Sequence, residues 1–502
     1  MRGRLVLSMT ALALLCGAPA LAQDKKPEPE KKDAPADIPA PLVSVTRHSG
    51  TFGGAKVSYT ATAKETYLKG EDGTPKASIF STSYVKDGAD PNRPVTFLFN
   101  GGPGSGSLWL HMGAFGPKRV AIPSDARDDG APPYPIIDNP DSLLDVTDIV
   151  FIDPVGTGFS HALGKTDPKD YWGVTADAKS VAQFIRIWLN ENNRWNAPKF
   201  LGGESYGTTR SAAVVNELEG TYNDVSLNGV ILISTILDFS AQAEVPGNEI
   251  VFVTTLPSMA ATAWYHDKVA DKPANVESFV AEAKAFAVGD YLSALIKGNA
   301  LSDAERAAVR AKLSRFTGLS ETYLDEANLR VYPGRFYKEL LRDRGQTVGR
   351  LDTRYTGRDY DNAGEEPDND PSFYGIDGGY TAAFNAYARQ TLNFRSDRDY
   401  VTIGGVRDWD WKIGRGDQTY YFNVAPYLGK ALRENSGLRI FVGQGYYDFA
   451  TPFFGAEYAL TRPGFPADRI QFRYYGAGHM MYVRDTDLHK LSADVRAFIR
   501  SR

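Results

Sequence analysis

Cysteine is almost absent from this chain of 502 residues, which has one, Cys16, near its start. A protein with no thiol beyond that position has no disulfides, no cysteine nucleophile and no thiolate metal ligands there. Histidine is also scarce: the chain has six, and none stands at ligand spacing with carboxylates on one predicted helix. The sequence therefore predicts no metal site and no cofactor.

A long apolar run and an excess of positive charge are missing as well. No stretch reaches the roughly 20 apolar residues that a membrane-spanning helix needs. The formal net charge is −5, whereas nucleic-acid binding generally needs a basic surface. We therefore expect no stable membrane insertion and no nucleic-acid partner, and the sequence carries no signal for an oligomeric state.

The first 22 residues have the layout of a secretory signal peptide. A basic start, residues 1–4, precedes an apolar run, residues 5–15, and small residues then lead to Ala22. This layout predicts cleavage after Ala22 and export to the periplasm or the medium. Lipidation at Cys16 is the alternative.

Residues 23–40 are charged and rich in proline, with almost nothing to bury, which predicts a disordered leader. The chain beyond it alternates between apolar runs and helical spacing. Short apolar runs predict buried strands at 94–99, 148–153, 199–202 and 229–235, and apolar residues at helical spacing follow at 175–190. Alternation of this kind predicts a mostly parallel, doubly wound α/β sheet, entered by an antiparallel hairpin over residues 56–62 and 77–85.

The pattern changes after Asp238. Residues from about 240 to 430 contain amphipathic segments and an irregular stretch rich in Tyr, Asp and Gly. Strand patterns return only at 438–442 and 470–475. We therefore expect one α/β domain, residues 41–502, with a largely helical cap inserted before its last strands.

The stretch Gly203-Glu204-Ser205-Tyr206-Gly207 lies between a predicted strand and a helix-compatible segment. Glycines two residues before and two residues after a serine are typical of a nucleophile elbow, in which a strained backbone presents the hydroxyl at the carboxyl edge of the sheet. The stretch predicts an α/β-hydrolase fold with Ser205 as its nucleophile.

A glycine-rich loop, Asn100 to Ser107, follows the predicted strand at 94–99. In α/β-hydrolases such a loop supplies a backbone N–H to the oxyanion hole. Gly102 suits that role because no Cβ blocks the approach of its amide to a substrate carbonyl. A phosphate-binding loop is excluded, because no Lys-Ser or Lys-Thr follows at the required spacing.

A serine hydroxyl needs a general base, and the base needs an acid to orient it. In α/β-hydrolases the acid and then the histidine follow the nucleophile along the chain, which leaves His479 and His489. We favour His479, because it directly follows the last strand, whereas His489 lies in the terminal amphipathic helix. Asp238 and Asp448 both follow strands, so position alone leaves both open as the acid.

Four motifs in this order resemble the serine carboxypeptidase family. They are Asn100-Gly101-Gly102-Pro103-Gly104, Gly203-Glu204-Ser205-Tyr206-Gly207, Asp448 with Thr451-Pro452, and Gly478-His479-Met480. The resemblance spans residues 94–482. It implies a secreted peptidase of the α/β-hydrolase fold that releases C-terminal residues from peptide substrates.

The resemblance also implies which residues act. It assigns Ser205 as the nucleophile and His479 as the base, and it chooses Asp448 over Asp238 as the acid. These three would form the catalytic triad.

The same resemblance implies that the N–H groups of Gly102 and Tyr206 form the oxyanion hole, and that Asn100 and Glu204 bind the terminal carboxylate of the peptide. The chemistry agrees, because a carboxylate needs hydrogen-bond donors. The Asn100 amide is one, and Glu204 is one only when it is protonated. Burial beside a bound anion disfavours the charged form of a carboxyl group, so binding should favour acidic conditions.

Two positions depart from the family pattern. Ala114 stands where eukaryotic members carry a second carboxylate-binding Glu, and Ser105 stands where they carry a Cys. Without the second Glu, the recognition of a terminal carboxylate has less support. An esterase or acyltransferase with the same triad is therefore the alternative function.

Overall fold

The computed structural model describes residues 38–220, 224–413 and 422–501, and these residues form one compact unit. The predicted signal peptide, residues 1–22, lies outside the described residues, as does nearly all of the predicted leader. Within the described residues, no helix combines the length and apolar character that crossing a bilayer requires.

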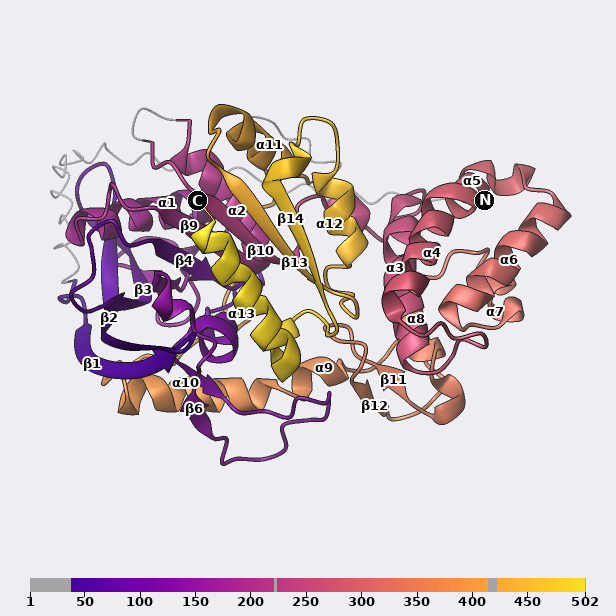
Figure 1. The fold of residues 1–502 in the computed structure, drawn as a ribbon, viewed down its shortest axis with the longest axis horizontal. Coiled ribbons are helices and arrows are strands. Elements are labelled where there is room, and N and C mark those ends of the chain that lie inside the picture. The colour runs from indigo at the N-terminus through magenta and orange to yellow at the C-terminus, as the bar shows by residue number, and fades with distance from the viewer. Residues whose placement is uncertain (1–37, 221–223, 414–421, 502) are drawn as a thin grey trace, which may run out of the picture. The chain divides into compact units, whose positions relative to one another are not determined.

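A ten-stranded sheet forms the centre of the fold (Figure 1). Its order is β1-β2-β3-β7-β4-β9-β10-β13-β14, with β8 paired to β3. The bounds are β1 (Val43–Phe52), β2 (Ala55–Lys69), β3 (Pro75–Lys86), β4 (Val95–Phe99), β7 (Asp148–Ile152), β8 (His161–Ala162), β9 (Lys199–Ser205), β10 (Gly229–Thr235), β13 (Arg439–Gly445) and β14 (Ile470–Tyr475). The strands from β7 to β14 in this order run parallel. The predicted mostly parallel sheet is therefore confirmed.

The antiparallel edge of the sheet extends further than the sequence predicts. The predicted hairpin is confirmed as β2 and β3, but an edge strand, β1, precedes it and pairs with β2. Most side chains of β1 are exposed or half-buried, so this strand carries little hydrophobic pattern. Two small sheets lie apart from the main one, formed by β5 (Lys118–Val120) with β6 (Ile136–Asp138) and by β11 (Thr347–Val348) with β12 (Thr356–Gly357).

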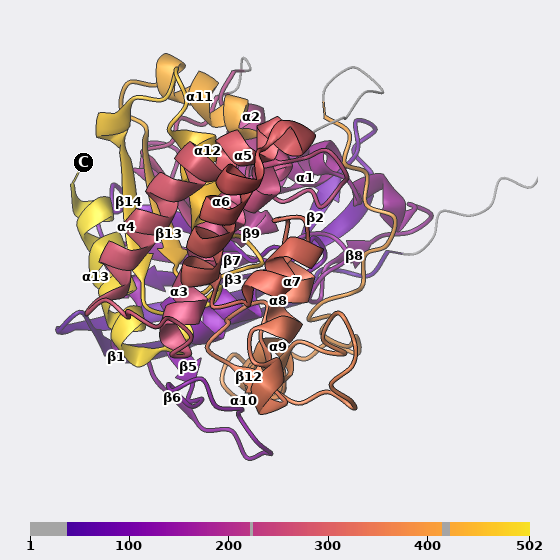
Figure 2. The same ribbon diagram turned by 90° about the vertical axis from the view of Figure 1, so that its right-hand side faces the viewer.

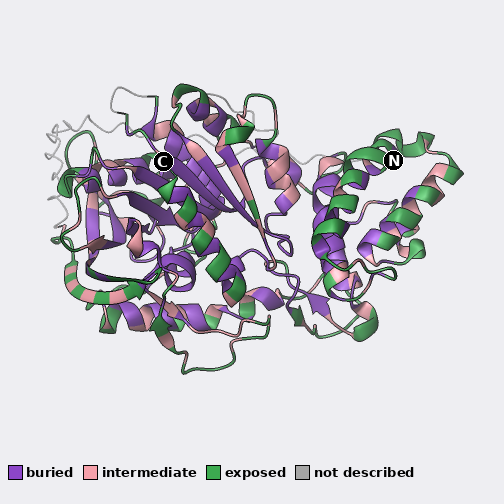
Figure 3. Ribbon diagram, in the orientation of Figure 1, coloured by how far each residue is buried: buried purple, intermediate pink, exposed green. Residues whose placement is uncertain are grey.

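Side chains of the inner strands alternate between two hydrophobic cores. In β10, Ile231 and Ile233 pack in one core, whereas Val230 and Leu232 pack in the other. This alternation is the period of two that a strand buried on both faces imposes. Figure 3 shows the inner strands almost wholly buried, with exposed residues on the covering helices, on the edge strand β1 and in the loops.

Helices cover both faces of the sheet. The first core includes residues of α10 (Asp377–Gln390) and α13 (Asp485–Arg500), and the second includes residues of α1 (Val174–Glu191), α2 (Tyr206–Leu218), α11 (Ala425–Glu434) and α12 (Phe453–Leu460). The predicted helix at 175–190 corresponds to α1, the helix-compatible segment after the Ser205 stretch to α2, and the terminal amphipathic helix to α13. The chain therefore has the layered architecture of the expected α/β-hydrolase fold.

A long segment separates two strands that are neighbours in the sheet. β10 pairs directly with β13, although residues 236–438 lie between them in the sequence. Helices of this segment gather beside the sheet (Figures 1 and 2). They are α3 (Ile250–Tyr265), α4 (Val276–Phe286), α5 (Leu292–Lys297), α6 (Asp303–Thr317), α7 (Glu321–Glu326) and α8 (Pro333–Glu339), and α9 (Pro371–Tyr374) follows. Residues of α3 to α8 share a third hydrophobic core, whereas α10 returns to the core of the sheet. The segment therefore has two parts with different packing.

Short turns complete the fold. Single π-helical turns occur at Leu110–Phe115 and Ala287–Tyr291. Short 3-10 turns occur at Leu143–Asp145, Pro168–Tyr171, Phe239–Ala241, Gly298–Ala300, Arg342–Arg344, Ala467–Arg469 and Met481–Val483.

Candidate active site

Ser205 stands at the junction of β9 and α2, with φ 60° and ψ −131°. A positive φ is strained for a residue other than glycine. The flanking glycines make the turn possible, because a Cβ on Gly203 would lie 2.1 Å from the carbonyl oxygen of Gly207. A Cβ on Gly207 would lie 3.0 Å from the carbonyl oxygen of Phe99. The spacing of the glycines is therefore a steric requirement of this strand-turn-helix junction.

The loops after β13 and β14 bring Asp448 and His479 together. The Nδ1 atom of His479 lies 2.8 Å from Oδ2 of Asp448. Thr451 fixes the carboxylate, because its N–H donates to Oδ1 at 2.9 Å and its hydroxyl donates to Oδ2 at 2.6 Å. Burial lowers the pKa of His479, but the Asp448 carboxylate and its hydrogen bond raise that pKa above its ordinary value.

The other two candidates from the sequence lie elsewhere. Asp238 caps a short turn, where Oδ1 accepts from the N–H of Ser240 and Oδ2 pairs with Arg462 at 2.9 Å. His489 lies on α13 with its side chain 60% exposed, and it pairs with Asp141 at 2.7 Å. Of the two aspartates that position left open, Asp448 is the one that contacts His479.

Asn100 and Glu204 form a buried hydrogen-bonded pair. The Nδ2 atom of Asn100 donates to Oε1 of Glu204 at 2.8 Å, and the N–H of Leu110 donates to Oδ1 of Asn100 at 3.0 Å, which fixes the orientation of the amide. The other carboxyl oxygen of Glu204 has no hydrogen-bond partner among the described residues. Burial raises the pKa of Glu204 to about 7, against the opposing effect of His479. Near neutral pH this carboxyl is therefore partly protonated, and a protonated carboxyl can donate to a bound anion.

The glycine-rich loop after β4 packs closely against the elbow. A Cβ on Gly101 would lie 2.6 Å from the backbone nitrogen of Tyr206 and 2.6 Å from the carbonyl oxygen of Glu204. Gly102 follows with φ +99°, a conformation that favours glycine. Tyr206 is the first residue of α2, and backbone N–H groups in the first turn of a helix have no intrahelical partner.

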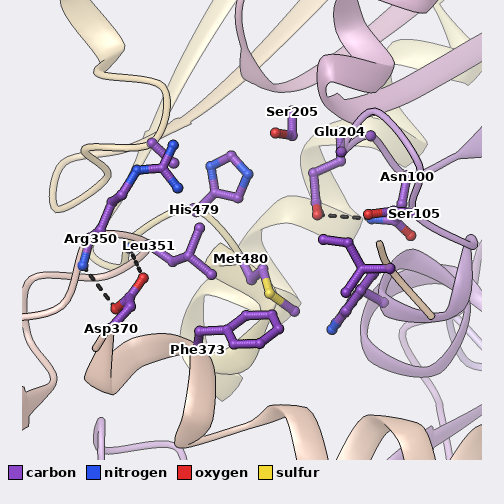
Figure 4. Close-up of a pocket in the computed structure, with 15 residues that line it drawn as sticks. Asn100, Ser105, Glu204, Ser205, Arg350, Leu351, Asp370, Phe373, His479 and Met480 are labelled. Atoms are coloured by element: carbon purple, nitrogen blue, oxygen red, sulfur yellow. Dashed lines mark hydrogen bonds between the residues drawn. The ribbon is translucent and has the colours of Figure 1, made fainter. Parts of the chain in front are cut away.

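These residues surround one cavity of about 360 Å³ (Figure 4). Its lining comes from the glycine-rich loop, the elbow, the loops after β13 and β14, and the long segment between β10 and β13. The lining residues are Asn100, Gly101, Gly102, Ser105, Trp109, Glu204, Ser205, Arg350, Leu351, Asp370, Phe373, Ile403, Ala450, His479 and Met480. The cavity thus brings together the Ser205 hydroxyl, the His479 imidazole, the buried Glu204 carboxyl and apolar side chains.

Arg210 supports this site, although it was not predicted from the sequence. It is the largest of the fully buried side chains. Its Nε donates to Asp177 at 2.6 Å and its Nη1 donates to the carbonyl oxygen of Asn100 at 2.6 Å. Its guanidinium carbon also lies 5.1 Å from the centre of the Tyr206 ring. One buried arginine therefore joins α1, α2 and the end of β4. In the sequence, Arg210 stands out only as a charged residue near the start of a segment of mostly small side chains.

The segment between β10 and β13 supports the loops that carry Asp448 and His479 through its backbone. The carbonyl oxygen of Leu351 accepts from the N–H of His479 at 2.6 Å, and that of Arg350 accepts from the N–H of Phe449 at 3.1 Å. Phe449 directly follows Asp448. The sequence did not predict these contacts, because residues 350 and 351 lie in the long segment after Asp238 and belong to no predicted strand, helix or motif.

No group of three or more His, Cys, Asp or Glu side chains is placed to hold a metal ion in the parts of the chain that the structure describes. The sheet order, the strained serine and the aspartate–histidine pair define the protein as an α/β-hydrolase.

The family follows from comparison with known proteins. The model of the serine carboxypeptidase family matches residues 63–480, so the chain belongs to that family of hydrolases. The structure of Kex1Δp, a prohormone-processing carboxypeptidase from Saccharomyces cerevisiae, has a TM-score of 0.52 and 16% identity, with 88% of this chain and 90% of that chain covered. This similarity shows a shared fold.

A second solved structure is more distant. The proline iminopeptidase of Mycobacterium smegmatis has a TM-score of 0.33 and 12% identity, with 90% of this chain and 97% of that chain covered. A search of curated proteins gives no match.

The buried ion pair beneath the site leads to a stability prediction. Replacing Asp177 by Ala should lower the free energy of unfolding by about 3–5 kcal/mol, because it leaves the Arg210 guanidinium buried without its carboxylate. Urea unfolding followed by tryptophan fluorescence measures the change.

Glu191 at the end of the same helix provides a matched control. Its side chain is 45% exposed and pairs with Lys64, so Glu191→Ala should cost at most about 1 kcal/mol. Equal losses in the two variants would contradict a structural role for the Asp177–Arg210 pair.

Proposed function

We propose that this protein is a serine-type carboxypeptidase that releases C-terminal residues from peptides through an acyl-enzyme on Ser205. One observation carries the proposal: the Asn100–Glu204 pair lines the same cavity as Ser205 and His479. Hydrogen-bond donors on Asn100 and Glu204 can bind the terminal carboxylate of a peptide. The peptide bond one residue away from that carboxylate then lies at Ser205.

In the first half of the reaction, His479 takes the proton of the Ser205 hydroxyl and the oxygen attacks the last peptide carbonyl. Asp448 holds Nδ1 of the imidazole, which leaves Nε2 to face the serine and stabilises the imidazolium that forms. The backbone N–H groups of Gly102 and Tyr206 hold the oxyanion of the tetrahedral intermediate.

In the second half, the imidazolium gives its proton to the leaving amine, the C–N bond breaks and the terminal residue departs. Water then attacks the ester carbonyl of the acyl-enzyme, and His479 takes the proton of that water. Collapse of the second intermediate returns the proton to Ser205 and releases the shortened peptide.

Recognition of the terminal carboxylate is assigned to the Asn100 amide and to protonated Glu204. Ala114 stands where eukaryotic members of the family carry a second carboxylate-binding Glu. It is fully buried in the π turn at Leu110–Phe115 and does not line the cavity. Glu204 therefore acts without a carboxyl partner, and its own pKa of about 7 sets the pH range of binding.

We also propose that the enzyme is exported. The proposal rests on the basic start, the apolar run and the small residues that end at Ala22.

Replacing Ser205 by Ala should abolish release of the terminal residue, because no other hydroxyl takes its place on the elbow. Mass spectrometry of the products of a blocked peptide measures the release, and circular dichroism checks that the variant is folded. Release at the wild-type rate by the folded variant would rule out the acyl-enzyme mechanism.

A C-terminally amidated twin of the same peptide separates this function from an esterase or acyltransferase. The wild-type enzyme should process the free acid faster, because the amide lacks the charge that Asn100 and Glu204 bind. Equal rates on the two peptides would favour the broader acyl-transfer function.

The pKa of Glu204 leads to a pH prediction. Below about pH 7 the carboxyl is protonated and donates to the substrate, whereas above that pH it is ionised and repels the substrate carboxylate. The KM for a free-acid peptide should therefore rise with pH, approaching about tenfold per pH unit above the pKa. Glu204→Gln should flatten this rise, since a neutral amide donates at every pH.

Glu219 is the matched control, because it is a buried carboxyl with a raised pKa that does not line the cavity. Glu219→Gln should keep the wild-type pH profile of KM. A Glu204→Gln enzyme with the wild-type profile would exclude Glu204 from carboxylate recognition.

A further inference from the structure

Arg350 is a cation in the catalytic cavity that the mechanism above does not use. It lines the cavity with Ser205 and His479, and its side chain is exposed. Figure 4 shows its guanidinium beside His479, on the side away from Glu204 and Asn100. The residue belongs to the segment between β10 and β13, and it lies outside all four motifs.

The backbone of Arg350 is fixed relative to the triad. Its N–H donates to Oδ1 of Asp370 at 3.0 Å, and its carbonyl oxygen accepts from the N–H of Phe449, next to Asp448, at 3.1 Å. These hydrogen bonds hold the Cα atom of Arg350 in a defined position at the wall of the cavity. A residue that selects substrates needs such a fixed backbone.

The guanidinium itself makes no ion pair or hydrogen bond with another residue that the structure describes. Asp370 is the aspartate that lines the same cavity, but its carboxylate already accepts from the N–H groups of Arg350, Leu351 and Ser372. The charge of Arg350 also acts on Glu244, a carboxyl whose pKa is raised by desolvation and by Glu366, against the effect of Arg350. The donors of the guanidinium thus remain available to a ligand in the cavity.

The direction of a bound peptide follows from the proposed function, on which this inference rests. The terminal carboxylate lies at Asn100 and Glu204, and the bond to be cleaved lies at Ser205. The residue on the acyl side of that bond then extends away from Glu204, which is where Figure 4 shows Arg350.

We propose that Arg350 binds the carboxylate of an acidic side chain at the penultimate position of the substrate, so that the enzyme favours peptides with Glu or Asp before the terminal residue. A guanidinium presents paired N–H donors that match the two oxygens of a carboxylate. The apolar side chains of Phe373, Ile403 and Met480 line the same cavity and provide contacts for the methylene groups of a glutamate.

The test uses blocked peptides that differ only in Glu against Gln, at the penultimate position in one pair and at the terminal position in another. The wild-type enzyme should show a kcat/KM about two to five times higher for Glu than for Gln at the penultimate position. Arg350→Gln should reduce this ratio to about one, and Arg350→Glu should reverse the preference toward a penultimate Lys. High salt should weaken the wild-type ratio, since an exposed pair is screened.

Arg389 provides a control, because it is an exposed arginine of α10 that does not line the cavity. Arg389→Gln should keep the wild-type ratio. An unchanged ratio in Arg350→Gln, or a change confined to the terminal pair, would overturn the proposal.

Equal loss on all free-acid peptides would also overturn it, because Arg350 would then bind the terminal carboxylate. Failure of the proposed function gives a different result, in which the wild-type enzyme releases no terminal residue from any of the four peptides. That result would overturn both proposals.

Discussion

The close backbone contact between the loop after β4 and the turn after β9 is the constraint on which the site depends. No Cβ fits at Gly101 or Gly203, since each would lie within 2.6 Å of a backbone atom across the contact or the turn. The contact brings the Asn100 amide to Glu204 and sets the glycine-rich loop beside the first N–H groups of α2. Arg210 reinforces it from beneath by donating to the carbonyl oxygen of Asn100. The strained serine is thus held by packing on both sides.

A second support comes from the segment between β10 and β13. Its backbone accepts hydrogen bonds from the residue after Asp448 and from His479 itself. The same two residues, Arg350 and Leu351, also line the cavity. One short stretch therefore both supports the loops of Asp448 and His479 and forms part of the cavity wall.

Features with a local signal could be predicted from the sequence. The apolar runs of the inner strands and the glycines around Ser205 were enough to predict the fold, and the place of His479 directly after the last strand was enough to favour it over His489. Contacts between distant residues had no such signal. Asp177 and Arg210 lie 33 residues apart on two helices. In the sequence, nothing distinguishes either of them from a charged residue at the surface. The choice of Asp448 over Asp238 needed the family resemblance, because both aspartates follow parallel strands.

The central claim is that Ser205 is a nucleophile activated by His479. Labelling of the folded protein with a fluorophosphonate, followed by peptide mass mapping, tests it most directly, because the probe reacts only with an activated hydroxyl. The account predicts one label per chain, located on Ser205, and a labelling rate that falls sharply in His479→Ala. Absence of label at Ser205 in the folded wild-type protein, or an unchanged rate in His479→Ala, would contradict it.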